Sequence, residues 1–174
     1  GKVYFGSNEY KGIYKYLCHY PDLYEKFIGI FHVRKYYNFT YNLNRISDEF
    51  KYEFLHHFSD EFKEAFEKGE IDKSLFPAGD YQYLEEIVDD PDRYYKKLMA
   101  VPVVFSTDDN YAPYLGIAIQ SLLDKADKSR NYYIAILADD ISDKNCEKLL
   151  SLETENSVIE IKDVSSYVDS KLMY

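Results

Sequence analysis

The amino-acid sequence predicts an α/β protein made of two parts: an all-helical module over residues 1–99 and an incomplete domain with a parallel sheet over residues 100–174. Of the 20 Tyr and 11 Phe, 24 precede residue 101, so the composition changes there. Before that point, apolar residues recur at helical spacing. After it, short β-branched runs alternate with helical patterns, which is typical of a parallel sheet with helices on its faces.

The longest helical signal in the module is a series of phenylalanines. Phe recurs every fourth residue from Phe50 to Phe66, which on a helix forms one apolar ridge. Ser47 and Ser59 each precede two acids, as helix N-caps do. This region is therefore either one kinked helix or two consecutive helices, and Gly69 suits its end.

Helical periodicity marks further segments of the module. Pro21 separates the first predicted helix from the second, because proline breaks a helix interior. Pro91 is well placed as a first helical residue, with Asp90 as its N-cap. The predicted helices cover residues 10–20, 22–37, 79–88 and 91–99.

The second part alternates strands and helices, which predicts right-handed crossovers and a parallel sheet. Such an arrangement is half of a nucleotide-binding α/β domain, and three strands alone leave an unprotected sheet edge. We therefore expect the chain to be a fragment of a longer protein. The predicted strands are residues 101–106, 132–138 and 158–161, the helices are 111–124 and 142–152, and Ser165 or Ser166 is placed to open another helix.

Polar and aromatic residues follow the first of these strands. In an open α/β sheet, ligands bind just beyond the carboxyl ends of the strands, where Asp108, Asp109, Asn110 and Tyr111 lie. Their carboxylates, amide and aromatic ring suit a base and a ribose. N-capping of the following helix is the structural alternative for the two acids. No G-x-G-x-x-G fingerprint is present, which argues against a dinucleotide enzyme.

The bulk composition narrows the range of partners. The chain carries 21 basic and 31 acidic side chains, which argues against a nucleic-acid backbone as a partner. Cys18 and Cys146 are far apart and form no C-x-x-C motif, so a reducing cytoplasm is the simpler expectation. No apolar run is long enough to span a bilayer. His56 and His57 point in different directions on a helix, so they do not suit a shared metal.

Residues 103–123, VVFSTDDNYAPYLGIAIQSLL, together with Ile136, Leu137 and residues 140–142, resemble the amino-terminal part of family 8 glycosyltransferases. The resemblance covers about residues 100–168, and its core is FSTDDNY at residues 105–111. It implies a Rossmann-like fold of the GT-A type and a divalent metal, Mn²⁺ or Mg²⁺. It also implies retaining transfer of a hexose from a nucleotide sugar, usually a UDP-sugar, to a glycan acceptor.

The same resemblance implies roles for five residues of a nucleotide-binding site. Ser106 and Thr107 would line the site partly through their backbone. Asp108 would accept a hydrogen bond from the uracil ring, Asn110 would contact the ribose, and Tyr111 would stack on the base. These roles agree with the polar turn after a strand that the sequence itself indicates.

The metal-binding motif of that family does not have a counterpart in the sequence. An Asp-x-Asp motif after a later strand holds the metal and diphosphate there, and that strand would lie beyond residue 174. Asp90-Pro91-Asp92 has the spacing, but it opens a helix and precedes the nucleotide strand, so we interpret it as helix capping. No catalytic residue or metal ligand is therefore assigned, and we expect this chain alone to bind no metal and to be inactive.

Residues 44–54, 69–72 and 90–95 resemble the helical tail of some bacterial family 2 glycosyltransferases. The first hypothesis is that the chain is a fragment of a hexosyltransferase of bacterial surface-polysaccharide synthesis. We expect this enzyme to be cytoplasmic or peripheral to the inner face of the membrane. Its partners would be a UDP-hexose and a glycan acceptor. The second is a non-catalytic helical docking module that links two transferase domains. We expect a homodimer through the sheet edge or the aromatic helices.

Overall fold

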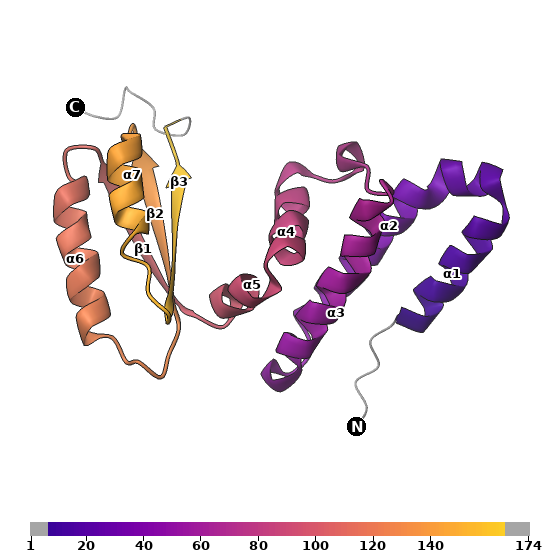
Figure 1. Cartoon of the computed structure of the whole chain (residues 1–174), viewed down its shortest axis with the longest axis horizontal. Helices are drawn as coiled ribbons and strands as arrows, with labels where there is room; N and C mark the ends of the chain where they lie inside the picture. The colour runs from indigo at the N-terminus through magenta and orange to yellow at the C-terminus, as the bar shows by residue number, and fades with distance from the viewer. Residues whose placement is uncertain (1–6, 166–174) are drawn as a thin grey trace. The chain divides into compact units, whose positions relative to one another are not determined.

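A computed structural model describes residues 7–165 and divides the chain into two compact units, Gly1–Tyr95 (unit 1) and Lys96–Tyr174 (unit 2). Unit 1 is helical, whereas unit 2 combines helices with a parallel three-stranded sheet (Figure 1). The predicted class, a helical module followed by a partial Rossmann-like half-domain, is confirmed. The division falls inside helix α5, and the helix that Ser165 or Ser166 was expected to open would follow residue 165, outside the described residues.

Unit 1 packs its helices around a core of aromatic rings. The Phe58 ring lies 5.1 Å from the rings of both Phe39 and Phe62, and all three side chains are at most 1% exposed. Such aromatic pairs stabilise a core beyond their buried area. The elements of the unit are α1 (Ser7–His19), α2 (Pro21–Leu43), α3 (Asp48–Glu67), the 3₁₀ helix η1 (Lys73–Leu75), α4 (Ala78–Asp89) and the first part of α5 (Pro91–Leu98).

Helix α3 is one continuous helix, so Ser59 does not cap a second one. Ser47 precedes α3 in an extended conformation, as predicted for its N-cap residue. Ser59 is instead buried in the helix interior, and its hydroxyl donates to the carbonyl oxygen of Val88 at 3.1 Å. A serine is tolerated inside a helix when its hydroxyl finds such an acceptor.

Gly69 ends α3 in the left-handed conformation, with φ of 69°. The Gly69 N–H donates to Phe66 O and the Glu70 N–H donates to Ala65 O, both at 3.0 Å. This pair of bonds is a Schellman motif, which satisfies carbonyl groups at the helix end. It also turns the chain so that Glu70 is buried against α2, where its carboxylate reaches His32.

Unit 2 is built on the parallel sheet, with strand order β1-β2-β3. The register pairs Asp108 of β1 with Asp139 of β2, and Ala138 of β2 with Asp163 of β3. The carboxyl ends of all three strands therefore share one edge of the sheet. The elements are β1 (Val101–Asp108), α6 (Ala112–Lys125), β2 (Tyr132–Asp139), α7 (Asp143–Leu150) and β3 (Ser157–Asp163).

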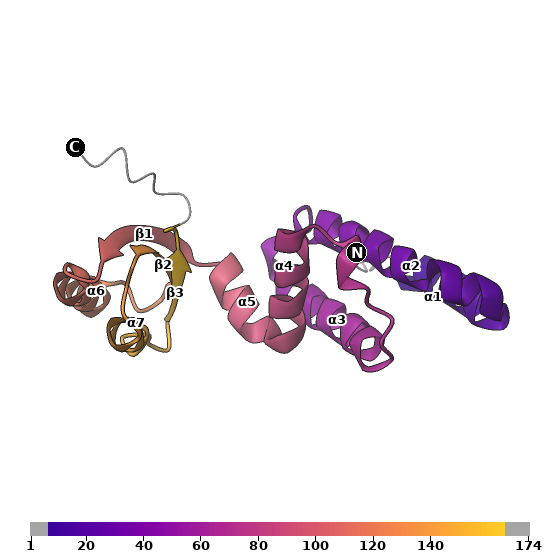
Figure 2. The same ribbon diagram turned by 90° about the horizontal axis from the view of Figure 1, so that it is seen from above.

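Both crossover helices of unit 2 cover the same face of the sheet (Figure 2). Leu115 and Ile119 of α6 and Leu149 of α7 share one apolar cluster with Ile134 and Ile136 of β2. The helices that the sequence predicted on the faces of the sheet thus lie on one face only within the described residues. Two successive right-handed crossovers that advance in the same direction across a sheet place their helices on one side.

The opposite face of the sheet carries a partly buried ion-pair cluster around Glu160 of the edge strand β3. Glu160 of β3 lies 2.6 Å from the Lys97 ammonium and 2.9 Å from that of Lys162, and it accepts from the Tyr133 hydroxyl at 2.8 Å. Burial alone would raise the pKa of Glu160, but these donors lower it to about 2. Elsewhere on this face Val104 is 63% exposed.

We predict that Gly69→Ala lowers the free energy of unfolding of unit 1 by about 1–2 kcal/mol, because the left-handed conformation strains any residue with a Cβ. Gly12→Ala is the matched control, since Gly12 lies in the exposed interior of α1 with open space around it. That change should stabilise by about 0.5–1 kcal/mol. Hydrogen exchange at the Phe58 amide measures the change in the free energy of unfolding in each variant. Changes of the same sign in the two variants would contradict the prediction.

We predict that unit 2 loses stability as the pH falls from 4.5, the ordinary Glu pKa, toward 2, the folded value for Glu160. A carboxyl group whose pKa is lower in the folded than in the unfolded protein stabilises the fold at pH values above the unfolded pKa. This contribution, up to about 3 kcal/mol, is lost as the pH falls through that window. Hydrogen exchange at the Ile134 amide at pH 6 and pH 3 measures it. The loss should be smaller in Glu160→Gln, and an equal loss in both proteins would contradict the prediction.

Candidate functional site

The candidate site is the carboxyl end of β1 and the turn that follows it. Ser106, Thr107 and Asp108 are the last three residues of β1, and Asn110 and Tyr111 lie between the strand and α6. The structure therefore brings all five predicted nucleotide-site residues together at one sheet edge. Ligands of open α/β sheets bind at this edge.

Asp108 holds the turn with one carboxylate oxygen. Its Oδ1 accepts from the backbone N–H of Tyr111 at 2.9 Å, immediately before α6 begins at Ala112. This contact closes the turn before the helix, but it reaches none of the N–H groups of the first turn of α6, so Asp108 does not have the N-capping role considered for it. Within residues 7–165 the second oxygen, Oδ2, has no hydrogen-bond partner. That oxygen can accept a hydrogen bond from a ligand.

Asp109 is bound more extensively, and it does not have the role of capping α6 that was considered for it. Its Oδ1 accepts from the Ser142 N–H at 2.8 Å, the Ser142 hydroxyl at 2.6 Å and the Asn145 side-chain amide at 2.8 Å. Hydrogen bonds from the Ser142 hydroxyl and N–H, with that from Asn145, hold the pKa of Asp109 below its ordinary value. Asp109 thus fixes the β1–α6 turn to the start of α7 instead of capping α6.

The side chains beyond the two acids leave a polar and aromatic surface. The Thr107 hydroxyl donates to the backbone oxygen of Asp108 at 3.0 Å, while Ser106 and Asn110 are exposed. Tyr111 is 66% exposed, although a tyrosine of a folded domain is usually buried to a larger extent. A flat, exposed ring beside hydrogen-bonding groups suits a planar base.

Sequence reasoning missed three residues at this site. Ser142 and Asn145 position Asp109, yet they lie 33 and 36 residues away in the chain. Tyr114 is 69% exposed, and its ring centroid lies 6.2 Å from that of Tyr111. The spacing of three residues on a helix could have indicated this last pair.

No metal centre accompanies the site within residues 7–165. No group of three or more His, Cys, Asp or Glu side chains in this range is placed to hold a metal ion. Asp90, part of the only candidate Asp-x-Asp motif in the sequence, accepts from the Arg93 N–H at 2.8 Å, which confirms its capping role. Asp92 instead lies 3.1 Å from the His56 ring.

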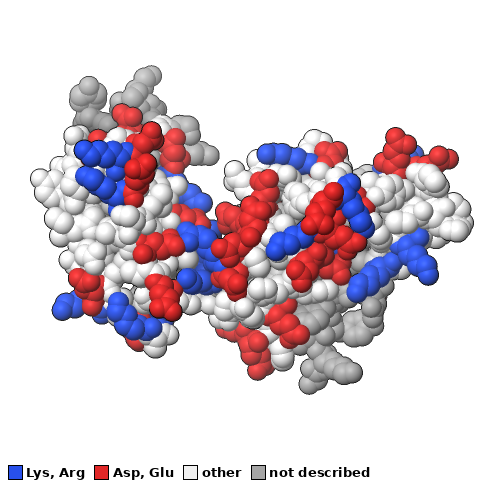
Figure 3. Space-filling model, in the orientation of Figure 1, with Lys and Arg blue, Asp and Glu red and all other residues white. Residues whose placement is uncertain are grey.

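Charged side chains of both signs are interspersed over the visible face of each unit in Figure 3. That face therefore offers no continuous basic surface of the kind that binds a nucleic-acid backbone. In residues 7–165, every helix is either too short or too polar to span a lipid bilayer.

The chain was compared with protein families, curated proteins and solved structures. No family model and no curated protein matches the chain. A solved structure described as the apo form of the bifunctional glycosyltransferase WbbM is 39% identical over the aligned part, with a TM-score of 0.39. The alignment covers 40% of this chain and 12% of that protein, so this chain spans only a small part of its length.

Proposed function

We propose that this chain is part of a glycosyltransferase and that the carboxyl end of β1 binds the uridine group of a nucleotide sugar. The observation that carries the proposal is the available Oδ2 of Asp108 beside the exposed ring of Tyr111. Uracil presents an N3–H donor on a flat ring, and an acceptor next to an aromatic face complements both features. The partial similarity to WbbM agrees with this function but does not carry it.

In this proposal the other residues of the turn bind the rest of the nucleoside. The exposed Asn110 amide reaches the ribose, and the backbone of Ser106 and Thr107 lines the site. Asp109 touches no ligand and acts as a positioning residue, because its three hydrogen bonds to Ser142 and Asn145 fix the turn. A site held in place before binding loses less entropy when its ligand arrives.

The finer features of the proposal come from the resemblance to family 8 enzymes. The donor is a UDP-hexose, the acceptor is a glycan of a bacterial surface polysaccharide, and the transfer retains the configuration of the sugar. A divalent metal would neutralise the diphosphate in such an enzyme. The described residues do not provide its ligands, so no step of the reaction is assigned to them.

The exposed apolar side chains of α1 and α2 favour a second candidate function, the docking of another domain. Ile13 of α1 and Ile30 of α2 are 50% and 51% exposed and line one apolar groove with Phe27. Exposed apolar patches of this kind are typical of interaction surfaces. Sedimentation of the native chain and of Ile30→Ser tests this function. An unoccupied docking surface should make copies of the native chain associate with one another, and the serine should weaken that self-association.

We predict that the chain binds UDP at least about tenfold more tightly than CDP, a difference of about 1.4 kcal/mol. Cytosine N3 carries a lone pair instead of a hydrogen, so it cannot donate to Asp108. Asp108→Asn should abolish this preference, because the asparagine can keep its turn contact through Oδ1 while its amide donates to cytosine N3. Titrations followed by amide NMR, with and without Mn²⁺, measure the affinities.

The matched control for this prediction is Asp124→Asn, at the far end of α6, where the carboxylate accepts from Gln120 at 2.9 Å. It should leave the preference for UDP unchanged. Shifts should cluster at residues 105–115 and change little with Mn²⁺. Equal binding of UDP and CDP by the native chain, or no binding by a well-folded protein, would refute the uridine site and leave docking as the better hypothesis.

A further inference from the structure

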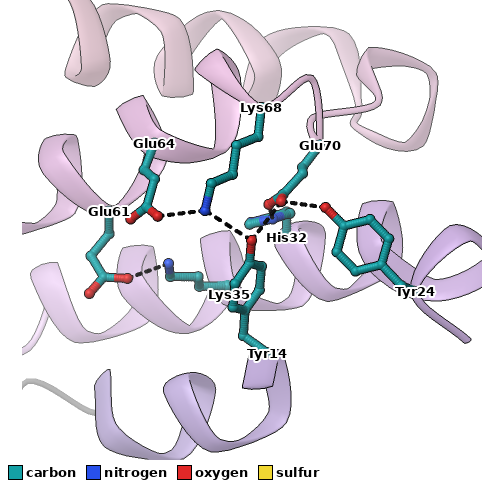
Figure 4. A network of polar contacts seen from close by, with 8 residues as sticks. All are labelled: Tyr14, Tyr24, His32, Lys35, Glu61, Glu64, Lys68 and Glu70. Atoms are coloured by element: carbon teal, nitrogen blue, oxygen red, sulfur yellow. Dashed lines mark hydrogen bonds and ion pairs between the residues drawn. The ribbon is translucent and has the colours of Figure 1, made fainter. Parts of the chain in front are cut away.

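A hollow of about 160 Å³ lies between α1, α2 and α3 of unit 1. Ionisable side chains from all three helices and from the segment after α3 converge on it (Figure 4). This concentration of charge differs from the rest of the interior of unit 1, where most buried side chains are aromatic or aliphatic. Perturbed ionisable groups gathered around a cavity are typical of binding sites.

Glu70 forms the floor of the hollow as a buried carboxylate. Its side chain is 3% exposed and accepts from Tyr14 at 2.7 Å, Tyr24 at 2.5 Å and the His32 Nε2 at 2.8 Å. Burial alone would raise the pKa of Glu70, but the donors Tyr24, Tyr14 and His32 hold it below its ordinary value. The floor therefore carries a negative charge at neutral pH.

His32 beside it has an unused acceptor. Burial lowers the pKa of His32, so the ring is neutral, and its Nε2–H donates to the Glu70 carboxylate. The other ring nitrogen, Nδ1, is then an acceptor, and it is buried without a hydrogen-bond partner in residues 7–165. A buried polar atom without a partner costs about 1–3 kcal/mol. A donor that is not part of this chain, such as a ligand hydroxyl or a water, would remove that cost.

The walls of the hollow alternate positive and negative groups. The Lys35 ammonium lies 2.5 Å from Glu61, and its side chain is only 6% exposed. Lys68 lies 2.6 Å from Glu64 and donates to the Tyr14 hydroxyl at 3.1 Å. Lys11 lies 3.9 Å from Glu61, so three lysines and three glutamates line the hollow. A strongly charged ligand would pair with either the lysines or the glutamates and leave the other group without partners, which favours a neutral ligand.

Stability alone does not account for this arrangement. The Lys35 ammonium lies over the Phe62 ring, 5.1 Å from its centroid, in a region that an apolar side chain could fill. Replacing buried ion pairs by apolar residues is often neutral or stabilising. The charged groups are therefore better explained by a ligand that they bind.

We propose that the hollow is a binding site for a single hexopyranose. Each hydroxyl of a sugar both donates and accepts, which matches neighbouring ammonium and carboxylate groups. The apolar C–H face of the ring needs an aromatic neighbour, and Tyr10 and Phe31, in edge contact at 5.7 Å, line the same hollow. Where the proposed transferase function also holds, this site binds a hexose of the acceptor glycan; the binding itself does not depend on that function.

Titration of the whole chain with D-glucose, D-galactose and D-mannose, each to about 100 mM and followed by amide NMR, tests the proposal. We expect saturable shifts at residues 10–14, 31–35 and 61–70 with at least one hexose. These residues are separate from the UDP-responsive residues 105–115, so failure of either site is recognised independently. Absence of saturable shifts with all three sugars on the folded chain would overturn the proposal.

Two variants test whether the hexose occupies the hollow. Ala65→Leu places a larger side chain in the hollow, which Ala65 lines, and Lys68→Met removes a donor at a half-exposed position. Both should weaken binding at least tenfold. Lys63→Met changes an exposed lysine of the same helix outside the hollow and should have no effect. If Ala65→Leu does not fold, Lys68→Met alone tests the site. An unchanged affinity of Lys68→Met for the hexose would then refute the site.

Discussion

The parallel alignment of β1, β2 and β3 is the constraint on which the architecture of unit 2 depends. Because the three strands run in the same direction, each needs a crossover helix before the next, and all their carboxyl ends meet at one edge. Right-handed crossovers in one direction place α6 and α7 on the same face, where their apolar residues form one cluster with the sheet. The polar turn after β1 thereby reaches the start of α7.

Carboxylates bound by several donors organise both units. Glu70 joins α1, α2 and the end of α3 through Tyr14, Tyr24 and His32. Glu160 joins β2, β3 and Lys97 in unit 2, and Asp109 joins the β1–α6 turn to α7. A carboxylate has four acceptor positions and can therefore hold several chain segments at once. The cost of burying its charge is offset only when those donors are present.

Features with a local cause were predictable from the sequence. Asp90 caps α5 and Gly69 ends α3 because caps depend on bonds between residues a few positions apart. The alternating strand and helix patterns also predicted the order of elements in unit 2, since each pattern reflects the period of its own segment. The sequence could not decide whether Ser59 caps a second helix, because its acceptor, Val88, lies 29 residues away.

The sequence by itself thus determined the two-part organisation, most element positions and the gathering of Ser106, Thr107, Asp108, Asn110 and Tyr111 after one strand. Only the tertiary structure decided what the acids of that turn contact: Asp109 binds Ser142, 33 residues away, while Asp108 keeps one oxygen available. The tertiary structure also brought Glu70 to His32, 38 residues apart, beside a hollow. Such contacts depend on how whole helices and strands pack, and local periodicity carries no information about the partner of a side chain across that distance.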